Sequence, residues 1–474
     1  MVGGMIEREA RHVAPFALRA MCLCALGGLF WVHGPALDAY FFLFDDYKLV
    51  GQALELPLFQ LISQPHFHYF RPFVHAEMSL EAAFFGWHHP SAYLALSLCI
   101  HMLSAWLLGT LLLTWFKPLE AACSALVFLL APWTLEATFW LSCRFDLWAT
   151  LWLLVSAHLL VRFKGGAFTW FWVGPLFLAF LSIECACVAA LAGCVLWWRW
   201  GGGSQPRGRA REGTQLTLTL AVFLGLRWLV MAVFAGADPL EGAKGNLFIL
   251  LFRTESVANL AAHLSAIAMP PLPEASLLPH LGHASLVVLA YVAALLKWRG
   301  RVVEVSVVVL LVLAPSLWLE RDPASTAGGR LLYVPTLFLA PLLVCGWSSA
   351  TQRFPRPGRG LALLFGLWGL FALPSASYQA GLWAAASQTS RDAIESYQGL
   401  VTRPGRYHLA NMPYVMKEGP YILKAYAFEW YGGRDGSEIS ATPLVYEVHD
   451  GAARPMPTWG ATQGAEAGVR TLRL

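Results

Sequence analysis

The sequence is poor in charge. Asp, Glu, Lys and Arg make up only 13% of the 474 residues, whereas hydrophobic residues make up 57%. A soluble globular protein carries roughly 25% charged residues, so the composition excludes an ordinary soluble protein. The 21 Trp and 29 Phe residues are typical of a polytopic membrane protein. We therefore expect an all-α polytopic membrane protein.

Disulfide and metal patterns are also lacking. The nine cysteines are odd in number, and none follows Cys345, so they do not form a disulfide framework. The Cys185-x-Cys187 pair is too closely spaced, in apolar surroundings, for a zinc site. There is no internal repeat.

The sequence contains no nucleic-acid-binding motif. The basic residues fall in short clusters between apolar runs and do not form a basic surface. We therefore expect no nucleic-acid partner.

Apolar segments recur through the first three quarters of the chain. The first follows Arg8 and Arg11 and has no obvious small-residue cleavage site after it, which is typical of an uncleaved signal anchor. We expect about 11 transmembrane helices. They are placed at 13–32, 92–115, 119–132, 139–160, 168–183, 185–198, 216–234, 281–296, 302–319, 331–347 and 361–373.

The basic clusters predict the topology. With a cytoplasmic N-terminus, the clusters that begin at Arg162, Arg199, Lys297 and Arg353 all lie in cytoplasmic loops. This requires that residues 246–269 do not cross the membrane and instead lie on the outer face as amphipathic or re-entrant helices. An ordinary span at 246–269 would place Lys297 outside. We favour the arrangement in which it does not cross.

The composition changes after Leu373. We expect residues 1–374 to form a transmembrane domain, with a long first outer loop at 35–90. Residues 375–474 are predicted to form a small mixed α/β domain on the extracytoplasmic side, with a helix at 377–400 and strands at 421–430 and 443–448. Such a domain would either grip an acceptor or shield a cavity.

Two adjacent carboxylates, Asp45 and Asp46, follow the first apolar segment. An ionised carboxylate close to hydrocarbon is costly, so it either starts a solvated loop or belongs to a site. The second interpretation is favoured because the predicted topology places further charged residues on the same side. These are Arg71, Glu136, Arg144, Asp146, Glu184 and Arg330.

The order of these features resembles the GT-C superfamily of membrane glycosyltransferases. Within it, the chain resembles the protein O-mannosyltransferases, their tetratricopeptide-bearing transmembrane relatives and bacterial homologues. The matching pieces, spread over residues 13–347, are FDDY at 44–47, YFRPF at 69–73, GWHHP at 86–90, Pro132 with Glu136, Arg144 with Asp146, LSIE at 181–184 and RLLYVP at 330–335. The chain departs from the relatives at Ile183, where many have Lys, at Ala131, where many have His, and in lacking a tetratricopeptide array.

The resemblance implies transfer of a sugar from a polyprenyl-phosphate-linked donor to a hydroxyl acceptor, which is a protein, lipid or glycan. It also implies a bacterial inner membrane with a periplasmic site. Such a reaction needs a carboxylate that takes the proton of the attacking hydroxyl, and cations that stabilise the leaving phosphate. In the family the acid of the first outer loop is the base. It corresponds here to Asp45 or Asp46, and we favour Asp45, with Asp46 orienting it or binding the acceptor.

Arginine binds phosphate through a bidentate fork, so Arg330, Arg144 and Arg71 are candidates for the lipid phosphate. Arg330, with Tyr333 one turn further on, is the preferred candidate, although it could instead be a residue that anchors the span in the interface.

Structural alternatives remain for the other charged residues. Glu136, Arg144 and Asp146 either bind substrate or form an ion-pair network that holds the loop ends. Glu184 has the same two alternatives.

Histidines offer a weaker metal alternative. His66, His68 and His75 could ligate a divalent metal, but we expect no cofactor. His101 is predicted to be a hydrogen-bonded core residue.

Two other functional classes compete with the enzyme. A transporter or flippase would show charged residues at mid-membrane and two similar halves, neither of which is evident. A non-catalytic scaffold for a lipid-linked glycan would not need Asp45 and Asp46 beside a row of arginines.

Overall fold

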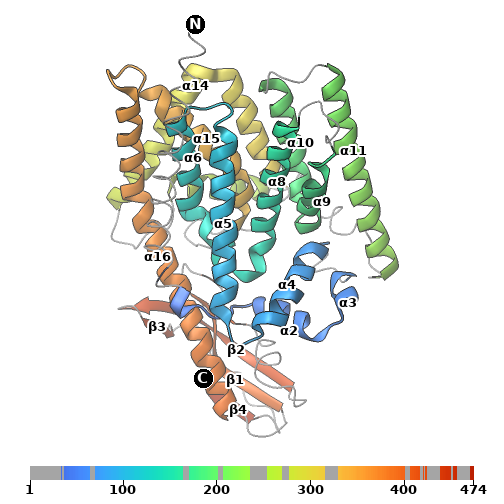
Figure 1. The fold of residues 1–474 in the computed structure, drawn as a ribbon. Helices are drawn as coiled ribbons and strands as arrows, with labels where there is room; N and C mark the ends of the chain where they lie inside the picture. The colour runs from blue at the N-terminus through green and yellow to red at the C-terminus, as the bar shows by residue number, and fades with distance from the viewer. Residues whose placement is uncertain are drawn as a thin grey trace.

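The computed structural model describes residues 34, 37–63, 70–163, 170–200, 206–234, 254–269, 277–314, 329–400, 406–416, 420, 422–423, 438–449, 452–455 and 470–473. These residues form a helical bundle with a small sheet at one end (Figure 1). Among them, six helices are long and apolar enough to cross a membrane, or seven if one bent pair is counted as a span. The chain is therefore a helical integral membrane protein, as its composition predicts.

The described residues contain fourteen α-helices. They are α2 (Asp46–Glu55), α3 (Leu58–Ser63), α4 (Pro72–Phe85), α5 (Pro90–Leu112), α6 (Pro118–Leu130), α7 (Leu135–Phe139), α8 (Arg144–Arg162), α9 (Val173–Ser182), α10 (Cys185–Trp200), α11 (Pro206–Leu229), α13 (Thr254–Ala268), α14 (Leu277–Leu313), α15 (Tyr333–Ala350) and α16 (Pro357–Leu400). Short 3-10 turns η1 (Pro132–Thr134), η2 (Leu141–Cys143) and η5 (Gly329–Leu332) and a π turn η3 (Val230–Phe234) complete them.

The bent pair lies at Pro132. Helix α6 stops at Leu130, and the next residue, Ala131, is extended with φ −63° and ψ 122°. Proline lacks an N–H and disfavours a helical residue before it, so the chain breaks here and turns by 54° into η1 and α7. The bend carries Glu136 of α7 into the buried interior of the protein.

The described residues cover all or part of ten of the eleven predicted spans. Predicted span 13–32 lies outside the described residues. Helices α9 and α10 have only 10 and 16 residues and meet at Glu184, so each is shorter than the roughly 20 residues that a crossing needs. Helix α13 covers part of the segment 246–269, and its apolar portion is also short. Eleven spans and the non-crossing arrangement of 246–269 stay predictions.

Helices α14 and α15 pack very closely. Helix α14 contains a break at Trp298, with φ −129° and ψ 44°, which separates the two arms predicted as spans 281–296 and 302–319. A Cβ at Gly346 of α15 would lie 1.9 Å from the Ala290 carbonyl oxygen of α14, so only glycine allows this approach. The Trp347 Nε1–H next to it donates to the Leu286 carbonyl oxygen at 3.0 Å.

Helix α16 is unbroken from Pro357 to Leu400 and contains Pro374. It therefore continues past the predicted domain boundary at residue 374 and projects beyond the bundle toward the sheet (Figure 1). The described strands β1 (Arg406–Met416), β2 (Glu438–His449), β3 (Ala452–Pro455) and β4 (Arg470–Arg473) form one sheet in the order β3-β2-β1-β4. Strand β1 is parallel to β2 and β4, whereas β3 is antiparallel to β2.

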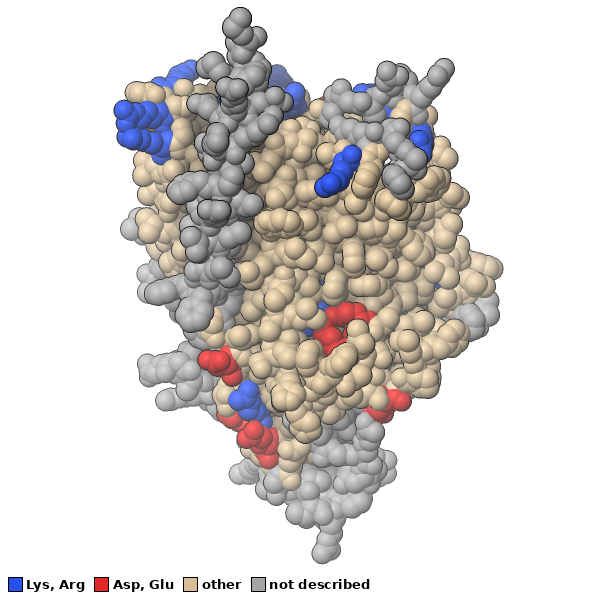
Figure 2. All heavy atoms as spheres, viewed as in Figure 1, with Lys and Arg blue, Asp and Glu red and all other residues tan. Residues whose placement is uncertain are grey.

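Charge is unevenly distributed over the surface. On the face seen in Figure 2, Lys and Arg gather at the end of the bundle away from the sheet, and Asp and Glu gather near the sheet end. Exposed basic residues lie near helix ends or at the break in α14; they include Lys117, Arg299, Arg301, Arg353 and Arg356. The two ends of the bundle are therefore chemically different.

Candidate active site

The two adjacent acids have different surroundings. Asp46 is fully buried at the start of α2. Its Oδ2 accepts the Leu43 N–H at 3.1 Å, and its Oδ1 accepts the Ser142 N–H at 2.8 Å and the Ser142 hydroxyl at 2.7 Å. Burial raises the pKa of Asp46 to about 7, although these three hydrogen bonds lower it. Asp46 thus ties the acid-bearing loop to η2.

Asp45 is half-buried rather than buried. It is the N-cap of α2 with helical φ and ψ, and its side chain makes no capping hydrogen bond. Its backbone carbonyl accepts the Leu49 N–H at 3.0 Å, which fixes the main chain of Asp45 at the start of the helix. Of the two acids, Asp45 is the less buried.

The loop before these acids is held from the C-terminal side. Ser387 and Ser390 of α16 donate to the Phe41 and Phe42 carbonyl oxygens at 3.3 and 2.7 Å. Phe44 adopts a positive φ of 44°, which is uncommon for a residue with a side chain, and its N–H donates to the Ile422 carbonyl oxygen at 2.9 Å. The part of the chain after residue 374 therefore shapes the loop that carries Asp45.

A second part of the site is built on Arg330 of η5. Its guanidinium contacts the Glu136 carboxylate at 3.2 Å, and its backbone N–H donates to the other Glu136 oxygen at 2.9 Å. The guanidinium lies over the Trp140 ring, 4.8 Å from the centroid, and its Nη1 is 3.4 Å from Cys143 Sγ. The Arg330 side chain is 25% exposed, whereas that of Glu136 is 2% exposed. The buried Glu136 therefore holds the Arg330 side chain in a position where part of it is exposed.

The segment from Trp140 to Cys143 joins these two parts. The Trp140 ring packs against Phe44 at 6.1 Å between centroids on the acid side and against Arg330 on the other. Cys143 is buried and lies within electrostatic range of Arg330, Glu136, Asp146 and Asp46. A single short segment thus places a half-exposed carboxylate and a partly exposed arginine in one region.

Arg144 is enclosed by protein groups. Its side chain has no exposed surface, and its Nη1 contacts Glu77 at 2.9 Å and also Glu81. Its Nε donates to Ser97 Oγ at 3.1 Å, and its Nη2 donates to the Tyr93 carbonyl oxygen. Arg144 thus forms ion pairs with Glu77 and Glu81 of α4, and not with Glu136 and Asp146, the acids of the network expected from the sequence. This geometry favours the structural alternative over phosphate binding for Arg144.

Asp146 and Arg71 lie near this region. Asp146 is 3% exposed in the first turn of α8, and its Oδ2 accepts no hydrogen bond from the described residues. Arg71 and Arg330 both act electrostatically on Asp146. The Arg71 guanidinium stacks on the Phe145 ring, 3.5 Å from its centroid. Asp146 therefore lies buried in the field of two of the three predicted phosphate-binding arginines.

The other predicted residues have mainly structural contacts. Tyr333 is buried, and its hydroxyl is 2.7 Å from Nδ1 of His101, whose Nε2 is 3.0 Å from the Leu129 carbonyl oxygen. This confirms that His101 is a hydrogen-bonded core residue and places Tyr333 beside it, inside the bundle. Glu184 accepts the Phe70 N–H at 2.8 Å and lies 3.7 Å from Arg227.

The metal alternative gains no support from the histidines that can be placed. His66 and His68 lie outside the described residues, and His75 is buried in α4. Among the described residues, no group of three or more His, Cys, Asp or Glu is arranged to hold a metal ion.

Burial of His75 gives a pH prediction. Burial and the nearby Arg71 lower the pKa of His75 to about 4, below the 6.5 of an unfolded chain. The unfolded state then binds more protons between these values, so His75 should lower stability by up to about 3 kcal/mol as the pH falls from 6.5 to 4. Melting temperatures across this window should fall less steeply in His75→Gln than in the wild type. His88→Gln, at an exposed position, should keep the wild-type slope, and equal slopes in all three would contradict the prediction.

Sequence reasoning missed several residues that organise the site. Ser142, Trp140 and Cys143 lie between two predicted site residues, but no motif distinguishes them from other interface residues. The change in composition after Leu373 predicts a separate domain that includes Ser387 and Ser390, so their contacts with the acid-bearing loop are not expected. A polar face on a helix that continues an apolar span is the signal that could have linked them to the membrane part.

No protein-family model and no curated protein matches this sequence. Among solved structures, the Archaeoglobus fulgidus oligosaccharyltransferase in complex with Zn and sulfate is similar over 89% of this chain and 62% of that chain, with a TM-score of 0.50 and 12% identity. The two proteins share a fold. It is the GT-C fold expected from the sequence. The similarity at this level of identity concerns the fold alone.

Two further structures of the Archaeoglobus fulgidus enzyme also match. One is the oligosaccharyltransferase AglB with an inhibitory peptide and a dolichol-phosphate, which covers 89% of this chain and 63% of that one, with a TM-score of 0.48 and 10% identity. The other is the apo form, with 90% and 64% coverage, a TM-score of 0.43 and 11% identity. The present chain thus spans less than two thirds of the length of these structures.

Proposed function

We propose that this protein is a GT-C membrane glycosyltransferase that transfers a sugar from a polyprenyl-phosphate-linked donor to a hydroxyl acceptor. The observation that carries the proposal is the position of a half-buried acid, Asp45, and a partly exposed arginine, Arg330, on either side of the Trp140–Cys143 segment. The fold that the chain shares with an oligosaccharyltransferase and its resemblance to O-mannosyltransferases both support sugar transfer from a lipid-linked donor.

In this proposal Asp45 is the general base. The attacking hydroxyl must lose its proton as it bonds to the sugar carbon, and a carboxylate on a residue that is not fully buried can accept that proton. Asp46 is unsuited to this role because both of its oxygens already accept protein hydrogen bonds. It is a positioning residue that holds the loop against Ser142.

Arg330 is assigned to the phosphate of the donor. The sugar–phosphate bond breaks as the acceptor attacks, so negative charge develops on the leaving phosphate, and a guanidinium stabilises that charge. Contact with Glu136 and the Trp140 ring fixes the direction of the Arg330 side chain. Arg71 would be a second cation near the phosphate, whereas Tyr333 and Glu184 support the helices that surround it.

The proposed orientation follows the charge distribution. The basic end of the bundle (Figure 2) would face the cytoplasm, because positive residues are retained on that side. The acid-bearing loop and the sheet would then face the periplasm of a bacterial inner membrane. An acceptor hydroxyl on a protein, lipid or glycan would approach from there.

The experiment that tests this function uses purified protein in detergent and a panel of polyprenyl-phosphate sugars. We expect the wild type to transfer the sugar of one donor, or slowly hydrolyse it, and Arg330→Gln to lower kcat/KM by about 10²- to 10³-fold, in the range found when a preorganised group that stabilises transition-state charge is removed. Arg356→Gln, an exposed arginine at the other end, should keep wild-type activity.

Two outcomes would overturn the assignment. If the folded wild type neither binds a polyprenyl phosphate nor releases sugar from any donor, the protein is not such an enzyme. If it does so and Arg330→Gln is as active as the wild type, the phosphate lies elsewhere and Arg330 is only a helix-end anchor.

A further inference from the structure

A large cavity lies inside the bundle, away from the candidate active site. Its volume is about 580 Å³, and it is bordered by α5, α8, α10, α14 and α15. Helix α8 shows the separation. It carries Asp146 in its first turn and cavity residues from Leu153 to Val161, which lie about 10 to 23 Å further along at 1.5 Å per residue. The cavity is thus a second, unassigned space.

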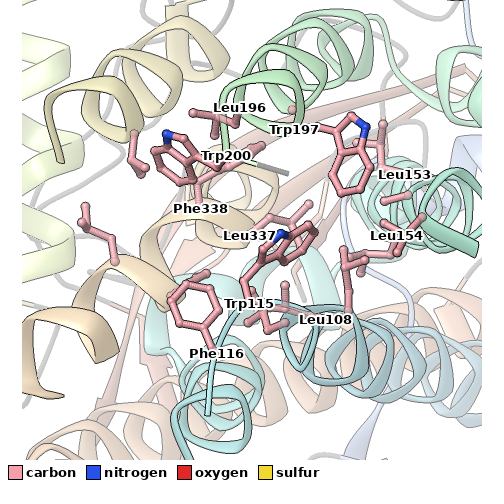
Figure 3. Close-up of a pocket in the computed structure, with 18 of the residues that line it drawn as sticks. Leu108, Trp115, Phe116, Leu153, Leu154, Leu196, Trp197, Trp200, Leu337 and Phe338 are labelled. Carbon is pink, nitrogen blue, oxygen red and sulfur yellow. The ribbon is translucent and has the colours of Figure 1, made fainter. Parts of the chain in front are cut away.

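The cavity is lined by apolar side chains. Figure 3 shows Leu and aromatic residues of several helices around it, among them Leu108, Leu154, Trp197 and Phe338. Its volume is within the 300–1,000 Å³ typical of ligand pockets. Such a lining does not select a sugar or a phosphate, because burying these groups without hydrogen bonds is costly. It suits a hydrocarbon chain.

One edge of the cavity is cationic. Lys117, between α5 and α6, and Arg301 of α14 both border it and are exposed. In the part of the chain that the structure describes, neither forms an ion pair. The Arg301 guanidinium lies 5.8 Å from the centroid of the Trp200 ring, which also borders the cavity.

The acid at the same edge is already engaged. Glu120 accepts the Lys117 backbone N–H at 3.1 Å through one oxygen and the Ser348 hydroxyl at 2.5 Å through the other. Its carboxylate therefore accepts hydrogen bonds from the start of α6 and from the end of α15. The two cations remain available to an anionic group at the edge.

We propose that this cavity binds one acyl chain of an anionic phospholipid, with the lipid phosphate held by Lys117 and Arg301. Tryptophans such as Trp115, Trp200 and Trp298 border the same cavity, and tryptophan is enriched at the depth of lipid headgroups. Anionic lipids are attracted to basic residues at a membrane surface. The site thus matches an apolar chain and an anionic head at the correct relative positions.

This lipid is distinct from the sugar donor. The donor phosphate is assigned to Arg330, which precedes α15, whereas the cavity is bordered by Arg301 and by residues of α15 from Leu337 to Cys345. The inference also does not rest on the proposed enzymatic activity. It would hold for any protein with this cavity, so its test uses lipid binding rather than turnover.

Gly193 of α10 allows the cavity to be filled. It borders the cavity, and a Cβ added there meets no atom within 4 Å. Leucine is also a better helix former than glycine, so Gly193→Leu should fold and place its side chain in the space. Gly225→Leu of α11 is the matched control, because its Cβ is equally unobstructed and Gly225 does not border the cavity.

The experiment compares purified full-length variants by native mass spectrometry after mixing with phosphatidylglycerol or phosphatidylcholine of identical chains. A photoreactive acyl chain then maps the contact. The wild type should retain one phosphatidylglycerol and cross-link to peptides containing Leu154 and Trp197. Gly193→Leu should lower retention about tenfold or more, and Gly225→Leu should not. The Lys117→Gln/Arg301→Gln variant should lose the preference over phosphatidylcholine, as expected when two charge-assisted contacts are removed.

Three outcomes would overturn the proposal. Cross-links in Gly193→Leu that match those of the wild type would show that the chain does not enter the cavity. An unchanged headgroup preference in Lys117→Gln/Arg301→Gln, when Arg353→Gln/Arg356→Gln serves as the control, would remove the phosphate assignment. Retention of polyprenyl phosphate in place of phosphatidylglycerol, abolished by Gly193→Leu, would assign the cavity to the polyprenyl chain instead.

Discussion

Asp45→Asn is expected to lower sugar transfer by about 10²- to 10⁴-fold, the usual contribution of a positioned general base, while the protein stays folded. Asparagine keeps the size of the side chain but cannot accept a proton. The native hydrogen bond from the Leu49 N–H to the Asp45 carbonyl is a main-chain contact, so it survives the substitution. The measurement is kcat at saturating donor and acceptor, together with the melting temperature of the same sample.

Asp46→Asn is the matched comparison, since it changes the neighbouring acid in the same way. An amide has only one oxygen, so either Leu43 or Ser142 would face an NH₂ group in place of an acceptor. A buried donor left unpaired costs about 1–3 kcal/mol, so this variant should melt earlier than Asp45→Asn. The reverse pattern, with Asp46→Asn stable but inactive and Asp45→Asn active, would make Asp46 the base.

The roles of the two acids could not be separated from the sequence. Asp45 and Asp46 differ by one position at the start of a helix, and successive helical residues point in different directions. Which one faces the interior depends on where Ser142 lies, 96 residues away. The sequence shows that two acids lie at the membrane edge, but only the fold shows that one of them is used to hold the loop.

Long apolar segments were predicted well because their signal is local. Helix α5 at Pro90–Leu112 was expected at 92–115, and α15 at Tyr333–Ala350 was expected at 331–347. The extent of α16 was not. A change in composition suggested a boundary at 374, but the polar residues after it bind the loop at 41–42 and keep the chain helical outside the bundle. The change in composition therefore indicates where the surroundings of α16 change, and it does not indicate where the helix ends.

Ion-pair partners were predicted poorly for a geometric reason. Asp146 is the nearest acid to Arg144 in sequence, but residues two apart on a helix do not face each other. The acids that do meet Arg144 lie on α4, 63 and 67 residues earlier. In the same way, Glu136 and Arg330 are 194 residues apart. Both partners of that second pair were predicted as site residues, although their contact was not.

Arg144→Gln is expected to destabilise the protein by about 3–5 kcal/mol, because it leaves buried acids without their cation. The side chains of Glu77 and Glu81 are only 10% and 6% exposed. Burial raises the pKa of Glu81, Arg144 lowers it, and the neighbouring Glu77 raises it further. Glu81 is therefore inclined to hold a proton even beside Arg144. Without the arginine, both buried acids lose the cation that they contact.

The measurement is the melting temperature and the monodispersity of each variant in the same detergent. Arg144→Gln should melt far below the wild type, whereas Arg356→Gln, at an exposed position, should change stability by about 0.5 kcal/mol or less. Adding Glu77→Gln and Glu81→Gln to Arg144→Gln should recover much of the loss, since no buried charge then lacks a partner. If Arg144→Gln melts like the wild type and only loses donor binding, Arg144 belongs to the phosphate site and the structural assignment is wrong.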